Sequence, residues 1–282
     1  MSALLLLHPD PRTRAILAGA LEPTYELEAV RNWRELERIL RSKTPLGCIL
    51  DIFNLNRVSA LPALRKLRKE HPGPALIACA DFTGREMELY RLGRIKVDGV
   101  IRLEDDLSSR QILGVVDRAM MAALASMVLR SVAKDRTPLV QECIRWAIEH
   151  AESRPQVSDL AAALALSHRS LTRELKAAGV APARTLLLWG RLIQASYLLA
   201  RPRETVESVA FRLAYSTAGA LRKALKRHVG CSPTSLLKRG GLAWTLEVFQ
   251  REGMSREQHR RSRWASSRSS RWRISPNAPR YR

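Results

Sequence analysis

A duplicated segment in the second half of the chain restricts its possible folds more than any other feature. Six positions of the segment 157–167 recur 49 residues later, and three following positions recur 50 residues later. The matching residues are Val157, Leu160, Ala161, Leu164, Ala165 and Ser167 with Val206, Val209, Ala210, Leu213, Ala214 and Ser216, then Leu171, Arg173 and Leu175 with Leu221, Lys223 and Leu225. A repeat of this kind predicts two copies of one structural unit, the second with a turn one residue longer.

Each copy predicts two short helices joined by a turn. In the first copy, Leu160 and Leu164 share one face of a helix, because residues four apart lie on the same side. Hydroxyl residues stand where the second helix of each copy should begin and can cap it: Ser167, and Ser216 or Thr217. The turn positions Ala165 and Ala214 cost about 1 kcal/mol each if their backbone is left-handed. This pattern favours two helix-turn-helix units.

The segment between the two units predicts a single connecting helix. Pro182 to Ala200 holds 19 residues, with no internal proline and one glycine. At about 1.5 Å per residue this helix spans roughly 28 Å. Two helices held that far apart can reach successive major-groove segments on one face of B-DNA, about 34 Å apart. The alternative is an ordinary helical bundle without a ligand.

The C-terminal half resembles the AraC/XylS family of transcription regulators over roughly Val140 to Leu237. Its most specific residues are Val206, Val209, Ala210, Leu213, Ala214, Tyr215, Leu221, Leu225, Gly230, Ser232 and Pro233. The resemblance implies an all-α domain in which two helix-turn-helix units bind a two-part site on double-stranded DNA. RNA polymerase is a further candidate partner.

The resemblance places the candidate DNA contacts on the second helix of each unit. They are His168, Arg169, Ser170, Thr172 and Arg173 in the first unit, and Thr217, Arg222, Lys223, Lys226 and Arg227 in the second. Ala218 and Gly219 occupy contact positions too, but they offer no long polar side chain. We therefore expect the first unit to read bases and the second to hold phosphates. Arg169 and Arg173 can each pair with a guanine or clamp a phosphate, and both alternatives stay open.

The net charge of +21 is unevenly distributed along the chain. Residues 1–120 carry +3, residues 121–250 carry +10 and residues 251–282 carry +8. This asymmetry favours a polyanionic partner for the second half.

Other motifs exclude several classes of protein. The four cysteines are too scattered for a zinc site or a disulfide framework, and we expect a reducing cytosol. The apolar run Leu4 to Leu7 is too short for a signal sequence, and we expect no stretch long enough to cross a membrane. No signature of an enzyme, a metal site or a cofactor site is present. We therefore expect a cytoplasmic protein that is not an enzyme.

Residues 1–120 predict an α/β domain with a five-stranded parallel sheet. The apolar runs ALLLL, YELEAV, LGCILD, ALIACA and VDGVI alternate with helical patterns that begin near Pro11, Trp33, Ser59, Thr83 and Leu107. Alternation of this sort is typical of a parallel sheet covered on both faces. Asp10 is suited to cap the first helix, with Pro11 at its first position.

This region resembles the receiver domain of bacterial response regulators over roughly Ser2 to Met120. Asp51 closes the third strand, where the resemblance places the phosphoacceptor. The departures are His8 and Pro9 in place of an acidic pair, Cys79 in place of a hydroxyl residue, and Arg102 or Leu103 in place of a lysine. The missing carboxylates would hold the divalent ion that supports phosphoryl transfer. We therefore expect a degenerate receiver, with a polar pocket at the carboxyl ends of its strands.

These observations divide the chain into four parts. They are a receiver-like domain at 1–120, a linker or extended helix at 121–138, a DNA-binding domain at 139–239 and an Arg/Ser-rich, disordered tail at 240–282. The long helix near the linker can pair with its copy in a homodimer or pack on its own sheet. Trp264, Trp272 and Tyr281 of the tail can stack on bases, or the tail can be a passive solubilising segment.

The leading interpretation is a sequence-specific transcription regulator with a receiver-like domain that works without phosphorylation. A response regulator that depends on phosphorylation of Asp51 is one alternative. A non-specific nucleic-acid binder is the other.

Overall fold

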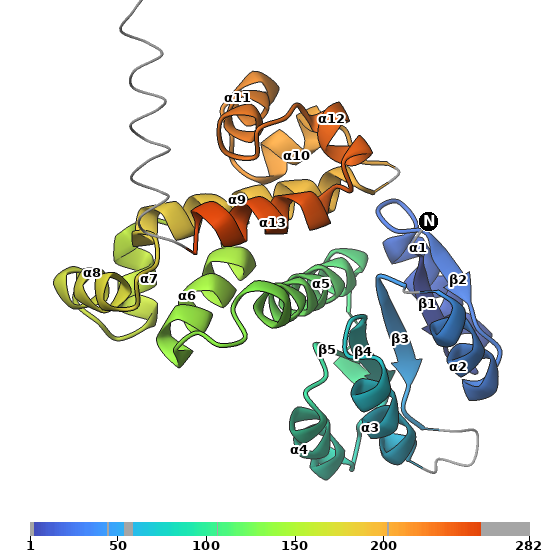
Figure 1. Ribbon diagram of the computed structural model, residues 1–282. Coiled ribbons are helices and arrows are strands. Elements are labelled where there is room, and N and C mark those ends of the chain that lie inside the picture. The colour runs from blue at the N-terminus through green and yellow to red at the C-terminus, as the bar shows by residue number, and fades with distance from the viewer. Residues whose placement is uncertain (1–2, 44, 54–58, 106, 202, 255–282) are drawn as a thin grey trace, which may run out of the picture. The chain divides into compact units, whose positions relative to one another are not determined.

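The computed structural model describes residues 3–43, 45–53, 59–105, 107–201 and 203–254. The chain forms two compact units that divide between Ser131 and Val132, and each is described by itself. Figure 1 shows the sheet of the first unit and the helices of the second. The tail from residue 255 onward, in which we expected disorder and stacking aromatic residues, lies outside the described residues.

Unit 1 contains a five-stranded parallel sheet. Its strands are β1 (Leu4–Leu7), β2 (Leu27–Ala29), β3 (Gly47–Asp51), β4 (Ala75–Ala80) and β5 (Gly99–Arg102). They lie in the order β2-β1-β3-β4-β5, and every neighbouring pair is parallel. This is the strand order of flavodoxin-like folds, which include the receiver domain. The predicted α/β fold is confirmed.

Helices cover both faces of this sheet. They are α1 (Pro11–Leu21), α2 (Trp33–Ser42), α3 (Leu61–Glu70), α4 (Glu86–Ile95) and α5 (Ser109–Val132), with a short 3-10 turn at Leu103–Asp105. Buried leucines of α2 and α3 share one core with Cys48 and other strand residues. Gly47 points to the opposite face, because side chains alternate along a strand. There α5 lies so close that a Cβ on Gly47 would be 3.2 Å from Met120 Sδ.

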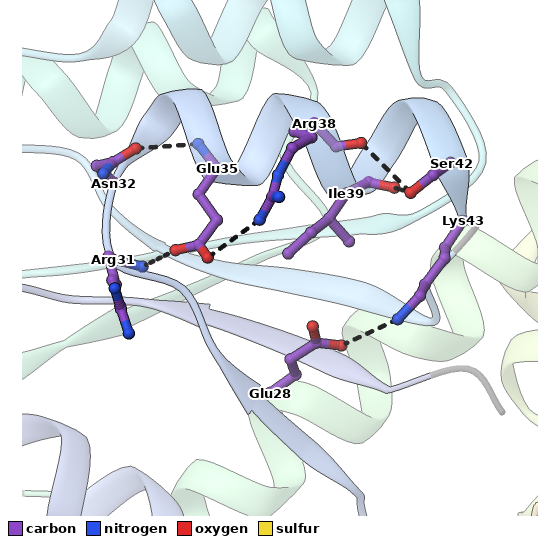
Figure 2. A network of polar contacts seen from close by, with 8 residues as sticks. All are labelled: Glu28, Arg31, Asn32, Glu35, Arg38, Ile39, Ser42 and Lys43. Carbon is purple, nitrogen blue, oxygen red and sulfur yellow. Dashed lines mark hydrogen bonds and ion pairs between the residues drawn. The ribbon is translucent and has the colours of Figure 1, made fainter.

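Polar contacts fix both ends of α2, as Figure 2 shows. The side chain of Asn32 accepts a hydrogen bond from the Glu35 amide at 2.9 Å, and the Glu35 carboxylate accepts one from the Arg31 amide at 2.8 Å. The first bond satisfies an amide that the first turn of a helix leaves without a partner, and the second fixes the chain just before the cap. Just after the helix, Lys43 Nζ lies 3.9 Å from Glu28 on β2. The helix is therefore fixed beside the edge of the sheet.

Helix α5 corrects the prediction that no stretch is long enough to cross a membrane. It has 24 residues, and an 18-residue window within it has a mean hydropathy of 1.8. Length and composition alone would therefore permit a membrane span. More than half of that window is buried within the folded chain, as in the core helix of a soluble protein. By composition this helix is weak evidence for a membrane span.

Unit 2 is all-α. Its helices are α6 (Pro138–Glu149), α7 (Val157–Ala163), α8 (His168–Ala177), α9 (Ala183–Leu199), α10 (Val206–Arg212), α11 (Ala218–His228), α12 (Pro233–Lys238) and α13 (Leu242–Glu252), with a 3-10 turn at Ala151–Ser153. Helix α9 contacts α6, α7, α8, α10, α12 and α13, so it is the packing centre of the unit (Figure 1). The predicted all-α second half is confirmed.

The connecting helix α9 forms where the sequence predicted it. Pro182 is its N-cap rather than a residue of its first turn, and the helix has 17 residues. At about 1.5 Å per residue its length is roughly 26 Å. Its closest packing is on α6, where a Cβ on Gly190 would lie 2.2 Å from the carbonyl oxygen of Ala147. Buried hydrogen bonds from Gln194 to Ile148 and between Ser196 and Thr245 also tie α9 to its neighbours.

Helix α13 is longer than the sequence indicated. We expected a disordered tail from residue 240 onward, but residues 242–252 form a helix that belongs to the core of unit 2. Phe249 is 1% exposed, and its ring lies 5.4 Å from that of Trp189 on α9. Helix α13 therefore buries apolar side chains against α9. Its short sequence pattern does not indicate this packing partner.

Candidate nucleic-acid interface

The two copies of the repeat fold into two helical hairpins, α7–α8 and α10–α11. In both hairpins the turn contains an alanine in the left-handed region, Ala165 with φ 52° and Ala214 with φ 51°. Each following helix is capped by a hydroxyl side chain, Ser167 for α8 and Thr217 for α11. Of the two candidates for the second cap, the structure therefore selects Thr217. This choice places the extra residue of the second copy between Ala214 and the cap.

Helix α8 presents four of the five candidate contacts of the first hairpin to solvent. His168, Arg169, Thr172 and Arg173 are exposed, and Ser170 is half-buried beside the cap. The Thr172 hydroxyl donates to the carbonyl oxygen of His168 at 2.8 Å. Arg173 lies 3.3 Å from Glu174, but its side chain is 75% exposed. Exposed ion pairs contribute little, so this arginine can exchange its partner for DNA.

Helix α11 presents cations rather than base-reading groups. Lys223, Lys226 and Arg227 are exposed, whereas Ala218 and Gly219 are short and half-buried. Arg222 Nη2 lies 2.7 Å from Glu207 on α10. The second hairpin therefore offers positive charge for phosphate groups and few side chains that distinguish one base from another.

Residues of both hairpins match a known domain family. The model of a helix-turn-helix domain family matches residues 160–239, which run from α7 through α12. Unit 2 contains an AraC-type helix-turn-helix domain. No curated protein matches the chain.

Solved structures match unit 1. The receiver domain of NtrX from Brucella abortus is 18% identical, covers 42% of this chain and 97% of its own, and has a TM-score of 0.37. The chemotaxis response regulator CheY4 of Vibrio cholerae is 15% identical, with 42% and 98% covered and a TM-score of 0.36. A LuxR-family DNA-binding response regulator from Staphylococcus aureus is 16% identical, with 43% and 99% covered and a TM-score of 0.37. The receiver-like fold itself rests on the strand order.

A cleft of about 1070 Å³ lies between the two hairpins of the AraC-type domain. The segment before α7, the first residue of α8, the first half of α9 and the end of α11 line it. His168 and Arg227, both candidate contacts, are part of this lining, together with Arg154, Arg184 and Arg191. Sequence comparison of the two repeats did not single out these last three, because they lie outside the second helices. The basic composition of residues 121–250 was the one available signal.

A second cleft, of about 310 Å³, lies at the carboxyl ends of the strands of unit 1. Its lining includes Asp51, His8, Asp10, Asp81 and Thr83. The predicted polar pocket is therefore present, with Asp51 at the end of β3. Among the residues that the structure describes, no group of three or more His, Cys, Asp and Glu side chains is arranged to hold a metal ion.

Cys79, which we expected in place of the hydroxyl residue of a receiver domain, does not line the cleft. Cys79 is fully buried inside β4, and it is Ala80 that lines the cleft. Thr83 supplies a hydroxyl residue three positions later, and Leu103 stands at the end of β5. Arg102 instead pairs with Glu104, with Nε 2.9 Å from the carboxylate. The sequence prediction for the end of β4 was therefore wrong by one residue.

Burial and hydrogen bonds shift the pKa values in this cleft in different directions. Burial raises the pKa of Asp51, although the Phe53 amide and the charge of His8 act against it. Burial also lowers the pKa of His8, against the nearby negative charge of Asp51. Asp10 caps α1, as predicted, and hydrogen bonds from the Thr13 hydroxyl and amide lower its pKa to about 2.

Proposed function

We propose that this chain is a sequence-specific transcription regulator in which both hairpins of unit 2 bind one duplex. The observation that carries the proposal is the common construction of the hairpins, each with a left-handed alanine turn and a capped second helix, packed on one connecting helix. Helix α9 sets their spacing at roughly 26 Å. In the proposed complex, α8 reads bases through Arg169 and Arg173, and α11 holds phosphates through Lys223 and its neighbours.

Base reading by the first hairpin is tested with Arg173→Ala. An arginine that pairs with a guanine contributes about 1–3 kcal/mol of discrimination. Site selection from a random duplex library, followed by titration of the selected and a random duplex, measures the ratio of the two affinities. We expect Arg173→Ala to reduce this ratio about fivefold or more while weak binding to both duplexes remains.

Lys176→Ala is the matched control, because Lys176 is an exposed cation in the last turn of the same helix. It should leave the ratio unchanged. If the unaltered protein binds selected and random duplexes equally, it is a non-specific nucleic-acid binder and the proposal fails.

Unit 1 in this proposal controls unit 2 without phosphorylation. His8 and Pro9 follow directly after β1, where a receiver would need carboxylates for its divalent ion, and Asp51 is half-buried. Transfer of a phosphoryl group to Asp51 would therefore lack electrostatic support. The chemistry of the cleft suits recognition of a ligand or a protein partner.

Phosphorylation of Asp51 remains the second candidate function, because Asp51 ends its strand and lines a cleft. Incubation of the full chain with acetyl phosphate and magnesium, followed by intact-mass measurement, separates the two. Our proposal predicts no added phosphoryl group. A labile phosphoryl group that is absent in Asp51→Asn would establish the response-regulator alternative.

The proposal includes a cytoplasmic location, a homodimer formed through unit 1 and a contact with RNA polymerase. The long apolar helix α5, beside the receiver-like sheet, is the observation that supports the dimer. Sedimentation velocity of the full chain tests it directly, and a monomer at all concentrations would remove it. Transcription in vitro with purified polymerase tests the last contact.

A further inference from the structure

The cleft between the hairpins has a strongly basic lining. Its lining includes four arginines and two histidines: Arg154, Arg184, Arg191, Arg227, His168 and His228. Among the described residues that line the cleft, none is an Asp or a Glu. A concave surface of one charge concentrates ions of the opposite charge, because its low-dielectric walls focus the electric field.

Some arginines of unit 2 form ion pairs and others do not. Arg173, Arg212 and Arg222 each lie within 3.3 Å of a glutamate oxygen. In the part of the chain that the structure describes, no carboxylate forms an ion pair with the guanidinium groups of Arg154, Arg184 or Arg227. These three exposed guanidinium groups can therefore take an anionic partner without first giving up an ion pair.

Arg191, which lines this cleft, is positioned by two contacts with the second hairpin. Its Nη2 donates to the carbonyl oxygen of Leu213 at 2.7 Å, and its guanidinium lies 3.9 Å from the centre of the Tyr215 ring. Burial lowers the pKa of Arg191, Tyr215 acts in the opposite direction, and the positive charge of Arg154 lowers it further. The two cations are thus close enough to repel each other, and a bound anion would relieve that repulsion.

Arg154 lines the cleft from the C-cap of the 3-10 turn Ala151–Ser153. It adopts a left-handed backbone with φ 52° and ψ 55° just before α7. Residues other than glycine rarely occupy this region, and such conformations cluster at binding sites. Here the left-handed residue is Arg154, which lines the cleft.

We propose that this cleft is a phosphate-binding site, and that its occupant is the DNA backbone where the duplex passes from one hairpin to the other. The proposal rests on the proposed function and extends it. The first residue of α8 and the last residues of α11 both line the cleft, so phosphates between the two major-groove segments lie next to it. Helix α9 is then a DNA-contacting element through Arg184 as well as a spacer.

Two variants of the full chain test this site. Arg184→Ala removes an exposed cation near the start of α9, and Arg154→Asn removes another while keeping a residue that tolerates the left-handed region. Lys238→Ala, an exposed cation on α12 outside the cleft lining, is the control. Dissociation constants for selected and random duplexes are measured over a series of salt concentrations, and thermal melts confirm that each variant is folded.

We expect each cleft variant to weaken binding to both duplexes about three- to tenfold and to reduce the slope of log affinity against log salt by about 1. The specificity ratio and the Lys238→Ala slope should not change. Unchanged slopes in both cleft variants would overturn the proposal. A specificity ratio near one in the unaltered protein, with the slopes still reduced, would reject the proposed function and leave the phosphate site standing.

A free phosphate-bearing molecule is the other source of the same chemistry. Calorimetric titration of the DNA-free protein with ATP, and with pyrophosphate, distinguishes it from the duplex. We expect neither to bind at micromolar concentration. Micromolar binding that Arg184→Ala abolishes, together with an unchanged salt slope for DNA, would assign the cleft to a free ligand and overturn the DNA occupant.

Discussion

Ala165 and Ala214 show how a single residue type can mark equivalent turns in two copies of a repeat. Both adopt a left-handed backbone, with φ of 52° and 51°, where glycine would meet no penalty from a Cβ atom. The sequence predicted this strain, because alanine stands where such turns usually have glycine. The same prediction could not choose the cap of α11, since Ser216 and Thr217 are chemically equivalent candidates.

Glycine at either turn should stabilise unit 2. Removing the Cβ relieves the left-handed penalty, against the greater freedom of glycine in the unfolded chain. We expect Ala165→Gly and Ala214→Gly each to raise the free energy of unfolding by a net gain of up to about 0.5 kcal/mol, and roughly to add in the double variant. Chemical denaturation measures this. Ala177→Gly, at the exposed last residue of α8, is the control and should give no gain in stability, because no left-handed alanine is relieved there.

Asp51 makes the stability of unit 1 depend on pH. Burial raises its pKa in the folded protein, so folding favours the protonated form. Its contribution is most favourable below the ordinary pKa of an aspartate and is lost as pH rises through the raised value. Asp51→Asn should therefore stabilise the protein at pH 7, and the gain should shrink as pH falls toward 4. Thermal unfolding at several pH values measures it, and a variant less stable than the parent at pH 7 would contradict this account.

Among the elements, α9 has the strictest packing requirement. Gly190 is one of the buried positions of this helix, and the backbone of α6 lies against it. The sequence predicted α9 from its length and lack of proline, but it could not identify Gly190 as a crossing point, because a lone glycine in a helical pattern has several explanations. The sequence also did not predict that α13 belongs to the core, because a short apolar pattern does not show which helix it packs against.

Gly190→Ala should strongly destabilise unit 2. Alanine improves helix propensity by about 1 kcal/mol, but its Cβ would lie 2.2 Å from the carbonyl oxygen of Ala147. Overpacking of this kind costs about 1–3 kcal/mol or more, so we expect a net loss. Gly219→Ala, at a half-buried helical position with no neighbour nearer than 3.6 Å, is the matched control and should be neutral or stabilising. Equal stability of Gly190→Ala and the parent would show that the two helices can separate freely.

At the scale of the whole molecule, the sequence predicted the two kinds of unit and their fold classes from periodicity and repeats. It did not predict the basic cleft, because Arg154, Arg184 and Arg227 belong to separate segments that meet only after α9 has packed. It placed the polar cleft of unit 1 correctly at the strand ends but displaced its β4 wall by one residue, from Ala80 to Cys79. Local patterns predict elements, whereas sites formed by several elements require the packing.

The spacing of protected DNA tests the central claim most directly, namely that two hairpins on one helix bind neighbouring turns of a duplex. Hydroxyl-radical footprinting of the full chain on its selected site should show two protected segments on one face. Their centres should lie about 10–10.5 base pairs apart, one helical turn. A single protected segment, or two segments half a turn apart on opposite faces, would contradict the account.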